Sequence, residues 1–269
     1  MSVVIADNLA INTADGIPPF PLSHARIGYL TICSAASVFA DSETPGFPAV
    51  AAVNPLTAEQ WRPVSLPATW TCLQQSDDAD YIGIAEHNLS GAVVSVEFTT
   101  NGTTWTQMQE LSPGDNSPIM ILFTPRTALG WRFVISSAPK LPQIGAIYIG
   151  KSLAMQRRIY GGHTPVTLGR VTELMPVRSE GGQFLGRQAI RKGVGTTYSW
   201  DNLEALWYRQ QFDPFVKAAI EVPFFISWYP EKYPAEVGFV WTTGDITPQN
   251  SGTRDLMSVS MTVVGNGGE

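Results

Sequence analysis

The chain has 269 residues, of which 44% are hydrophobic and 15% charged, and its formal net charge is −6. This composition excludes disorder over most of the length, because a disordered chain combines low hydrophobicity with high net charge. Residues 1–150 carry 5 Lys and Arg against 12 Asp and Glu, which argues against a surface there that reads nucleic acid. Residues 151–269 carry 12 against 11, and this step in charge predicts a domain boundary near residue 150.

Cysteine content and hydropathy indicate the environment of the protein. Cys33 and Cys72 are too few for a disulfide scaffold, and we expect buried free thiols, with one disulfide between them as the alternative. The N-terminus lacks the basic and apolar regions of a secretory signal, and no apolar run approaches the roughly 18 residues that cross a bilayer. We therefore expect a soluble protein that folds in a cytoplasm and does not insert into a membrane.

The first half of the sequence has the pattern of a β-sandwich. Residues 1–26 are weakly periodic and rich in proline, and we expect an N-terminal arm that joins the second domain or an interface. In Val93–Thr99, apolar and polar side chains alternate, as in a strand with one buried face. Similar short runs between turn clusters predict a sandwich over residues 27–150. The runs are Ile27–Cys33, Tyr81–Ala85, Val93–Thr99, Met120–Phe123, Trp131–Ile135 and Ile144–Ile149.

The second half predicts an α+β domain over residues 151–269. A Gly- and Arg-rich stretch, residues 178–187, suggests a long hairpin. One main helix is expected at about residues 201–219, because Asp201 can cap it and the pair Asp213-Pro214 restarts a helical turn. Three strands are expected after it, at Phe224–Tyr229, Val237–Thr242 and Leu256–Val264.

Motifs for catalysis or cofactor binding are weak. The segment Gly145–Ser152 fits the Walker A pattern, but its middle residues are strand formers and no helix signal follows, so we expect a strand that ends at Gly150. The three histidines, His24, His87 and His163, are isolated and lack the spacing of metal ligands. Glu97 and Glu110 lack the facing partner that a glycosidase needs. We therefore predict a protein that is not an enzyme and holds no cofactor or metal.

The cluster of Asp77, Asp78 and Asp80 offers oxygen ligands for calcium, but it lacks the EF-hand spacing, and a solvated turn is the preferred interpretation. Basic residues gather further along the chain, between Arg157 and Lys192. They could contact DNA phosphates nonspecifically, but they have little aromatic interleaving, so we prefer contact with an acidic face of a neighbouring subunit. The predicted interface residues are Arg157, Arg158, Arg178, Arg187, Arg191 and Lys192.

Residues 27–150 resemble discoidin-like, or galactose-binding-like, domains. The segment Thr99–Trp105 is similar to the strand-turn of that family, with Asn-Gly followed by Trp three residues after the Gly. Trp61, Trp70, Trp131–Ile135 and Ile144–Gly150 follow in the family's order, although Cys33 lacks the cysteine partner of extracellular members. The resemblance implies a jelly-roll sandwich with ligand-binding loops at one end. By position, the implied ligand residues are Trp61, Arg62, Asp77, Asp78 and Asp80, with Trp61 and Trp105 as core residues in the preferred alternative.

The whole chain resembles the distal tail proteins of long-tailed siphophages, which form a ring at the tail tip. This resemblance rests on the order of modules and on four segments, Met155–Gly162, Arg178–Gly182, Pro230–Pro234 and Trp241–Asp245. It implies a mainly β protein, with a discoidin-like β-sandwich plus a tail-tube-like α+β ring domain that has one main helix.

The same resemblance implies the partners and the location. The expected partners are copies of the chain in a homo-oligomeric ring, a hexamer, together with the tail tube protein and baseplate hub proteins. Tail DNA would pass through the lumen without sequence readout, and the protein would belong to the virion tail, assembled in the host cytoplasm. The alternative function is a carbohydrate-binding accessory or receptor-binding module that contacts a host surface glycan.

Overall fold

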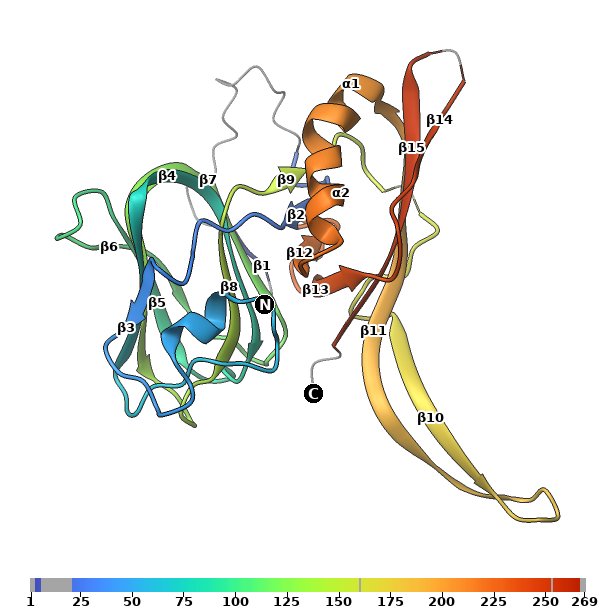
Figure 1. Ribbon diagram of the computed structural model, residues 1–269, viewed down its shortest axis with the longest axis horizontal. Helices are drawn as coiled ribbons and strands as arrows, with labels where there is room; N and C mark the ends of the chain where they lie inside the picture. Colours follow the sequence, from blue (N-terminus) through green and yellow to red (C-terminus); the bar gives the residue numbers. More distant parts are fainter. Residues whose placement is uncertain (1–2, 6–20, 160, 253, 267–269) are drawn as a thin grey trace.

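The protein is mainly β, as predicted, and its strands form two sheets, with a short 3-10 helix, η1 (Ala49–Val53), and one longer helical segment among the described residues (Figure 1). The computed structural model describes residues 3–5, 21–159, 161–252 and 254–266, so most of the predicted N-terminal arm lies outside the described residues. Within these ranges the sheets have seven and eight strands. No helix among the described residues is long and apolar enough to cross a membrane.

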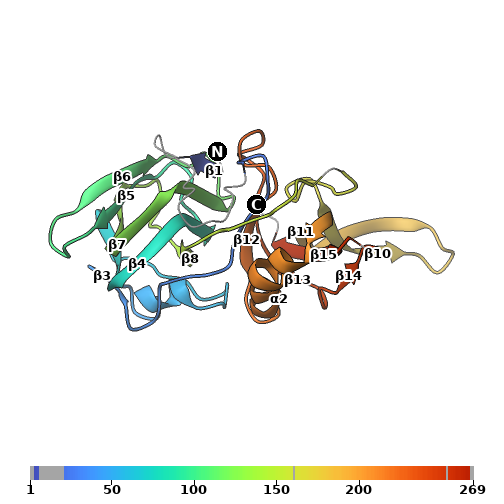
Figure 2. The same ribbon diagram turned by 90° about the horizontal axis from the view of Figure 1, so that it is seen from above.

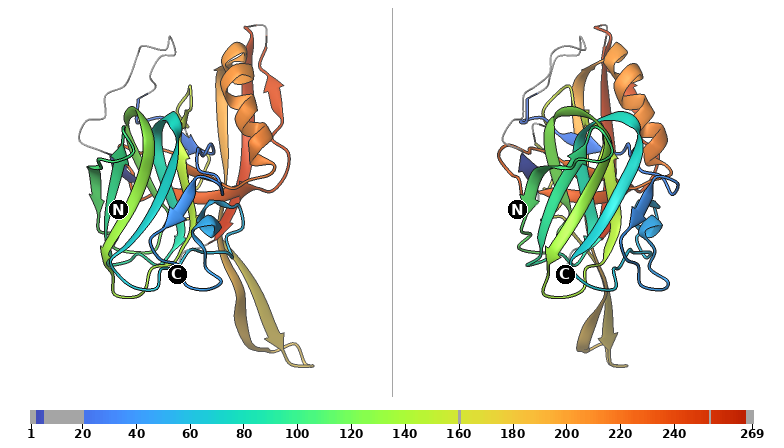
Figure 3. Two further views of the ribbon diagram at one scale, coloured as in Figure 1. Left: turned by 60° about the vertical axis from the view of Figure 1, so that its left-hand side comes forward. Right: turned by 90° about the vertical axis from the view of Figure 1, so that its left-hand side faces the viewer.

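The first sheet folds over on itself into a β-sandwich. Its centre is an antiparallel ribbon of two long strands, β4 (Ala68–His87) and β7 (Ile119–Ser137). Irregularities in the pairing between Leu73 and Asp77, and between Ala79 and Tyr81, let the ribbon arch from one layer into the other (Figure 3). The remaining strands of this sheet are β1 (Val3–Ile5), β3 (Val38–Ala40), β5 (Val93–Thr99), β6 (Thr106–Leu111) and β8 (Ile144–Gly150).

Two arms of the β4–β7 ribbon form the two layers of this sandwich. One layer pairs the start of β4 and the end of β7 with β3, β5 and β6, and the other pairs the end of β4 with β8 and the start of β7 with β1. The side chains between the layers are apolar and include the fully buried Trp61, Trp70 and Trp131. Strand β8 ends at Gly150, as predicted, so the Walker-like segment lies in a buried strand.

The second sheet carries the helical segment on one face. Its order is β10-β11-β15-β13-β12-β2-β9, with β14 beside β15. Phe215 of the helix packs edge-on against Phe224 of the sheet, with ring centroids 4.9 Å apart. The strands are β2 (Arg26–Gly28), β9 (Leu153–Ala154), β10 (Arg170–Arg178), β11 (Phe184–Glu204), β12 (Phe224–Ser227), β13 (Val237–Thr242), β14 (Pro248–Asn250) and β15 (Leu256–Asn266).

The helical segment begins later than the sequence pattern predicts. It consists of α1 (Ala205–Trp207), the π-helical stretch η2 (Tyr208–Phe212) and α2 (Asp213–Ala219). Asp201, the expected cap, lies in strand β11, because β11 stays paired with β15 as far as Glu204. Leu203 is fully buried in that strand, so its apolar side chain belongs to the sheet and not to a helix.

The sandwich is inserted into the second sheet. Apart from β1, which comes earlier, the strands of the sandwich lie between β2 and β9 in the chain, and β2 and β9 pair with each other at one edge of the second sheet. Ile27, expected in the sandwich, instead pairs with Ile226 of β12. The chain therefore enters the sandwich after Gly28 and leaves it at Gly150.

A third apolar cluster joins the sandwich to the second sheet, and Figure 2 shows the two units side by side. Tyr81 and Tyr148 point from the outer face of the sandwich, and Phe225 and Phe239 point from the sheet. Gly83 permits this close approach, because a Cβ atom there would lie 2.5 Å from the Phe225 ring. The layer of β4, β7 and β8 is consequently buried on both faces, which explains its nearly continuous apolar runs.

Candidate functional site

Trp61 has no exposed surface, which removes it from the ligand site that the family resemblance implies. Its backbone forms a bridge with Ile144, and its indole nitrogen donates a hydrogen bond to the Ser42 carbonyl at 3.3 Å. A sugar platform needs a free ring face. Trp61 thus belongs to the core, as the alternative weighed from the sequence has it, whereas Trp105, named with it, is only partly buried beneath Arg132.

The structure does not bring the other implied ligand residues together. The Arg62 guanidinium lies 4.5 Å from the centroid of the Phe47 ring, beside the start of β8. Asp80 lies at the other end of β8, where it accepts a hydrogen bond of 2.6 Å from the Ser152 backbone nitrogen. The seven residues of β8 between them correspond to about 20 Å of extended chain, so these groups cannot share one small ligand.

The three aspartates lie in strand β4 and not in the solvated turn that we expected. Asp78 accepts a hydrogen bond from Thr127 and lies 3.4 Å from the Lys151 ammonium, and Asp77 is exposed beside Ala128. Burial raises the pKa of Asp80 to about 6, although the hydrogen bond from Ser152 and the charge of Arg26 lower it. Within the described residues, no group of three or more His, Cys, Asp or Glu side chains could hold a metal ion.

The three histidines and Glu97 make contacts within the fold. His87 is buried, its Nε2 lies 3.0 Å from the Ser117 carbonyl, and burial lowers its pKa to about 4. His24 contacts the Met155 carbonyl, and His163 packs edge-on against Trp228. Glu97 forms an ion pair of 2.5 Å with Arg132 on the neighbouring strand.

The cysteines are free and buried, as expected from the sequence. Burial raises the pKa of the Cys33 thiol well above its usual value. The Cys72 sulfur lies 3.5 Å from the Ser37 hydroxyl. These thiols therefore belong to the sandwich core.

The most unusual surface feature is a long hairpin, which we define as residues 170–193 of β10 and β11 with their connecting turn. It extends away from both units (Figures 1 and 3). Every residue of β10 is exposed. Large apolar side chains along the hairpin are nevertheless exposed, with no covering layer formed by the described residues. They are Val171, Leu174, Met175, Val177, Phe184, Leu185 and Ile190.

The hairpin has one basic face. Residues paired across an antiparallel ladder share a face, and neighbours along a strand alternate between faces. The pairing therefore places four cations on one face, and Val171, Met175 and Val177 on the other, where Glu173 opposes Arg191. The four cations are Arg170, Arg178, Arg187 and Lys192.

The predicted interface residues divide into two groups. Four of them, Arg178, Arg187, Arg191 and Lys192, lie on the hairpin. Arg157 instead donates a hydrogen bond of 3.1 Å to the Asn202 carbonyl, and Arg158 lies 4.9 Å from the Tyr229 ring centroid.

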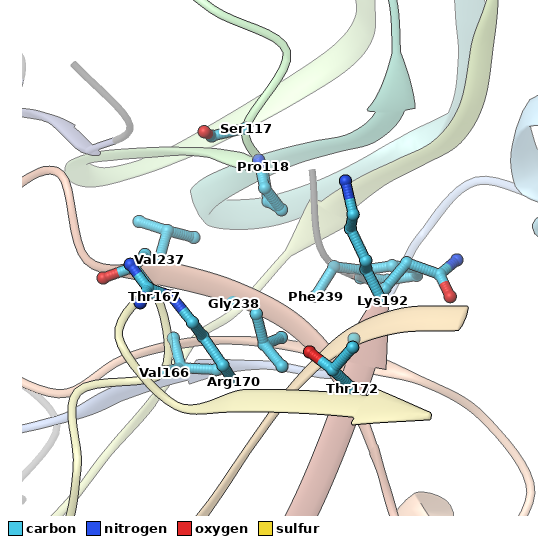
Figure 4. A pocket seen from close by; sticks show the side chains of 13 residues that line it. Ser117, Pro118, Val166, Thr167, Arg170, Thr172, Lys192, Val237, Gly238 and Phe239 are labelled. Carbon is cyan, nitrogen blue, oxygen red and sulfur yellow. The ribbon is translucent and has the colours of Figure 1, made fainter. Parts of the chain in front are cut away.

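A pocket of about 260 Å³ lies where the hairpin base meets the sandwich. Ser117 and Pro118 of the sandwich face it from one side, and Gly238 and Phe239 of the second sheet face it from the other (Figure 4). Arg170 and Lys192 contribute cations, but their charged ends point to different parts of the pocket. The arrangement does not focus both charges on one small anion.

An open groove of about 440 Å³ lies elsewhere along the junction of the two units. Leu56 comes from the sandwich, Ile220 from the end of the helical segment and Trp241 from β13. The exposed fractions of Leu56 and Ile220 are 57% and 66%. Sequence reasoning missed this groove, because segments about 165 and 185 residues apart in the chain meet to form it.

No protein-family model matches the sequence, and no curated protein matches it. Among solved structures, the chain is similar to chitosan-binding module 1 of a chitosanase/glucanase from Paenibacillus sp. IK-5, with 18% identity, a TM-score of 0.41, and coverage of 45% of this chain and 98% of that one. It is also similar to the family 32 carbohydrate-binding module of C. perfringens NanJ in complex with galactose (17%, TM-score 0.39, coverage 42% and 91%). A Streptococcus pneumoniae fucose-binding module is similar as well (13%, TM-score 0.40, coverage 45% and 95%). The sugars in these descriptions are ligands of those proteins.

Proposed function

We propose that this chain is a non-enzymatic structural subunit that assembles with copies of itself into a ring. The main evidence for this proposal is the hairpin of residues 170–193, whose large apolar side chains are exposed along its length. Soluble monomers rarely leave large contiguous apolar surfaces uncovered, and such surfaces mark protein interfaces. A protruding two-stranded ribbon is also marginally stable by itself, so contact with another chain would stabilise it.

The position of the hairpin suits head-to-tail assembly. Strand β10 forms one edge of the second sheet, and β9, of two residues, lies at the other end of the strand order. The arm therefore belongs to one side of the subunit, and the contact is head-to-tail when the surface that receives the arm lies elsewhere on the next copy. Repeated head-to-tail contacts close into a ring when the rotation between copies divides a full turn.

We further propose that the ring lies at the tail tip of a long-tailed phage and joins the tail tube to the baseplate or receptor-binding apparatus. This step rests on the siphophage resemblance of the sequence and on the inserted arrangement of the two units. The second sheet with its hairpin would form the ring, and the sandwich would lie outside it. The expected copy number is six.

Negative-stain microscopy and native mass measurement of the full chain test the assembly. We expect closed rings for the wild type and monomers for the double variant Phe184→Ser/Leu185→Ser, which removes the two large apolar side chains near the hairpin turn. Phe39→Ser is the matched control, because Phe39 is also exposed but lies on the sandwich strand β3. A ring that survives the double variant unchanged would argue against the hairpin as its contact.

Glycan binding by the sandwich is a second proposal. Arg62 lies over the Phe47 ring at the loop end of the sandwich, and both side chains are partly exposed. Because Arg62 covers one face of the Phe47 ring, a sugar would contact the other face or the edge of the ring, with its hydroxyl groups against the donors of the guanidinium. A glycan array that includes chitosan, galactose and fucose tests this, with Arg62→Ala as the variant. Specific binding that is lost in Arg62→Ala supports the proposal, and an array without specific signal contradicts it.

A further inference from the structure

The groove of Leu56, Ile220 and Trp241 combines an apolar floor with an acidic border. Three large apolar side chains from separate segments surround one hollow and are only partly covered. Among the described residues that line the groove, Glu221 is the one charged residue. Glu59 does not line the groove, but it follows the lining residue Ala58 in the chain, is exposed, and accepts a hydrogen bond of 2.7 Å from the Asn54 side chain. A partner for this surface therefore needs apolar side chains with positive charges beside them.

The hairpin tip, residues 178–187, has that composition. Phe184 and Leu185 are 67% and 64% exposed, and they are the most exposed large apolar side chains of the hairpin. Arg178 pairs with Phe184 across the ladder, and Arg187 follows two residues after Leu185. The tip thus presents apolar groups between two guanidinium groups, and the exposed carboxylate of Glu180 in the turn leaves it one positive charge in excess.

The turn of the tip is held in a defined conformation. The Ser179 backbone nitrogen donates to the Gln183 carbonyl at 2.9 Å, and the Gly182 nitrogen donates to the Ser179 carbonyl at 2.9 Å. Gly182 has a φ of +81°, a backbone conformation that glycine adopts without strain. A tip that is ordered before contact loses less conformational entropy when it binds.

The hairpin of one chain cannot reach its own groove. The ribbon extends away from the body in every view, whereas the groove lies between the sandwich and the end of the helical segment (Figures 1 and 3). An occupant from the same protein must therefore come from a second copy. A groove volume of about 440 Å³ is within the roughly 300–1,000 Å³ of pockets that enclose compact ligands, so it has room for the tip side chains.

We propose that the hairpin tip of one copy docks in the groove of the next copy, with Phe184 and Leu185 against Leu56, Ile220 and Trp241. Arg178 and Arg187 then lie near Glu59 and Glu221, and the opposite charges steer and orient the contact. This inference rests on the proposed ring, and it names the surface that receives the arm. Because the groove includes both units, each contact would also hold the neighbour's sandwich in place against its second sheet.

Disulfide trapping between two full-length chains tests the docking. One chain carries Leu185→Cys and the other carries Ile220→Cys, and they are mixed, oxidised and analysed by non-reducing electrophoresis and intact mass. The native thiols of Cys33 and Cys72 are buried and do not compete. The matched control replaces the second chain by Phe39→Cys, which places an exposed thiol on the sandwich strand β3, outside the residues that line the groove.

The outcomes separate the two proposals. Cross-linking of Leu185→Cys to Ile220→Cys at least tenfold above the Phe39→Cys control is the expected result. Rings that form in microscopy without this preference would overturn the docking and leave the ring standing. A chain that stays monomeric at all concentrations would overturn both proposals.

A second measurement compares the strength of self-association after reversal of one carboxylate charge in the groove and of one elsewhere. Glu221→Arg is expected to weaken self-association at least tenfold, whereas Glu110→Arg, on the exposed strand β6, changes it less than twofold. Equal effects of the two variants would count against the docking.

Discussion

The two long antiparallel ribbons, β4–β7 and β10–β11, both carry large apolar side chains, but those of β4–β7 are buried and those of the β10–β11 hairpin are exposed. The β4–β7 ribbon is wrapped into a sandwich, and one of its arms is covered on both faces, with Tyr81, Met120 and Leu122 against the second sheet. The β10–β11 ribbon carries similar side chains, such as Leu174 and Val177, into solvent. The difference shows that, among the described residues of one chain, nothing covers the hairpin of the second ribbon as the second sheet covers the first ribbon.

The two ribbons also differ in charge. The covered arm of β4–β7 has few charged groups, and its one strongly perturbed carboxyl, Asp80, lies at the arch. The hairpin instead carries Arg170, Arg178, Arg187 and Lys192 on one face. Charges along an exposed ribbon keep it soluble and limit uncontrolled strand pairing until its partner binds.

The largest effect is expected at the junction of the two units. Phe225 is fully buried, with its ring centroid 4.7 Å from that of Phe239 and 5.5 Å from that of Tyr148. Phe225→Ala would lower the free energy of unfolding by about 3–5 kcal/mol, because it leaves a cavity between two layers. Urea denaturation measures this loss of unfolding free energy, with Phe39→Ala, a change at an exposed phenylalanine, as the control. A loss below about 1 kcal/mol would show that the junction contributes little to stability.

Acid is expected to destabilise the sandwich through His87. Its folded pKa of about 4 lies below the unfolded value of 6.5, so the unfolded chain binds the extra proton first. Stability is full above pH 6.5 and falls as the pH drops from 6.5 to 4, by up to about 3 kcal/mol. The pKa of Asp80 is raised, so its contribution to stability changes with pH in the opposite direction. The effect of His87 is therefore isolated by measuring the unfolding free energy of wild type and of His87→Gln across this window and taking the difference. A constant difference from pH 7 to pH 4 would contradict it.

A smaller effect is expected where the junction needs a glycine. In Gly83→Ala the added methyl would lie 2.5 Å from the Phe225 ring, which is enclosed and cannot move freely. We expect a loss of about 1–3 kcal/mol in unfolding free energy from overpacking. Gly114→Ala is the control, because nothing lies within 4 Å of a Cβ there. Similar unfolding midpoints for the two variants would contradict the tight approach of the layers.

The smallest effect on chain stability is expected in the hairpin stem. Met175→Ser/Val177→Ser changes two exposed side chains, so the unfolding free energy of the dilute monomer should stay within about 0.5 kcal/mol of wild type. The same variant should weaken self-association. A large loss of monomer stability would mean that these side chains pack within their own chain.

The sequence predicted much of the sandwich, because its strands follow simple periodicities. Val93–Thr99 alternates and forms β5, and Ile144–Gly150 forms β8. The start of the helix was missed, because Leu203 is apolar at both helical and strand spacing and the pairing with β15 decides between them. Asp77 and Asp78 indicated a turn, but they form part of an arch whose irregular pairing tolerates polar residues.

The candidate interface was only partly predictable. The basic stretch around Arg178 and Arg187 indicated a subunit contact, because its cations are spread over a Gly-rich segment. The groove of Leu56, Ile220 and Trp241 gave no sequence signal, since it exists only when the inserted sandwich lies against the second sheet. We predicted Trp61 as a ligand residue because of its position in the family pattern. Its burial in the structure shows that it is a core residue.

The most direct test of the central claim is the mass of the full chain in solution over a wide concentration range, compared with a chain whose hairpin is shortened. Glu173 and Arg191 are paired across the ladder, so replacing residues 174–190 by Asn-Gly joins them through a two-residue turn. We predict that the wild type forms a closed assembly of fixed copy number and that the shortened chain stays monomeric with unchanged thermal unfolding. A wild-type chain that remains monomeric across the range, or a shortened chain that assembles equally well, would contradict the claim.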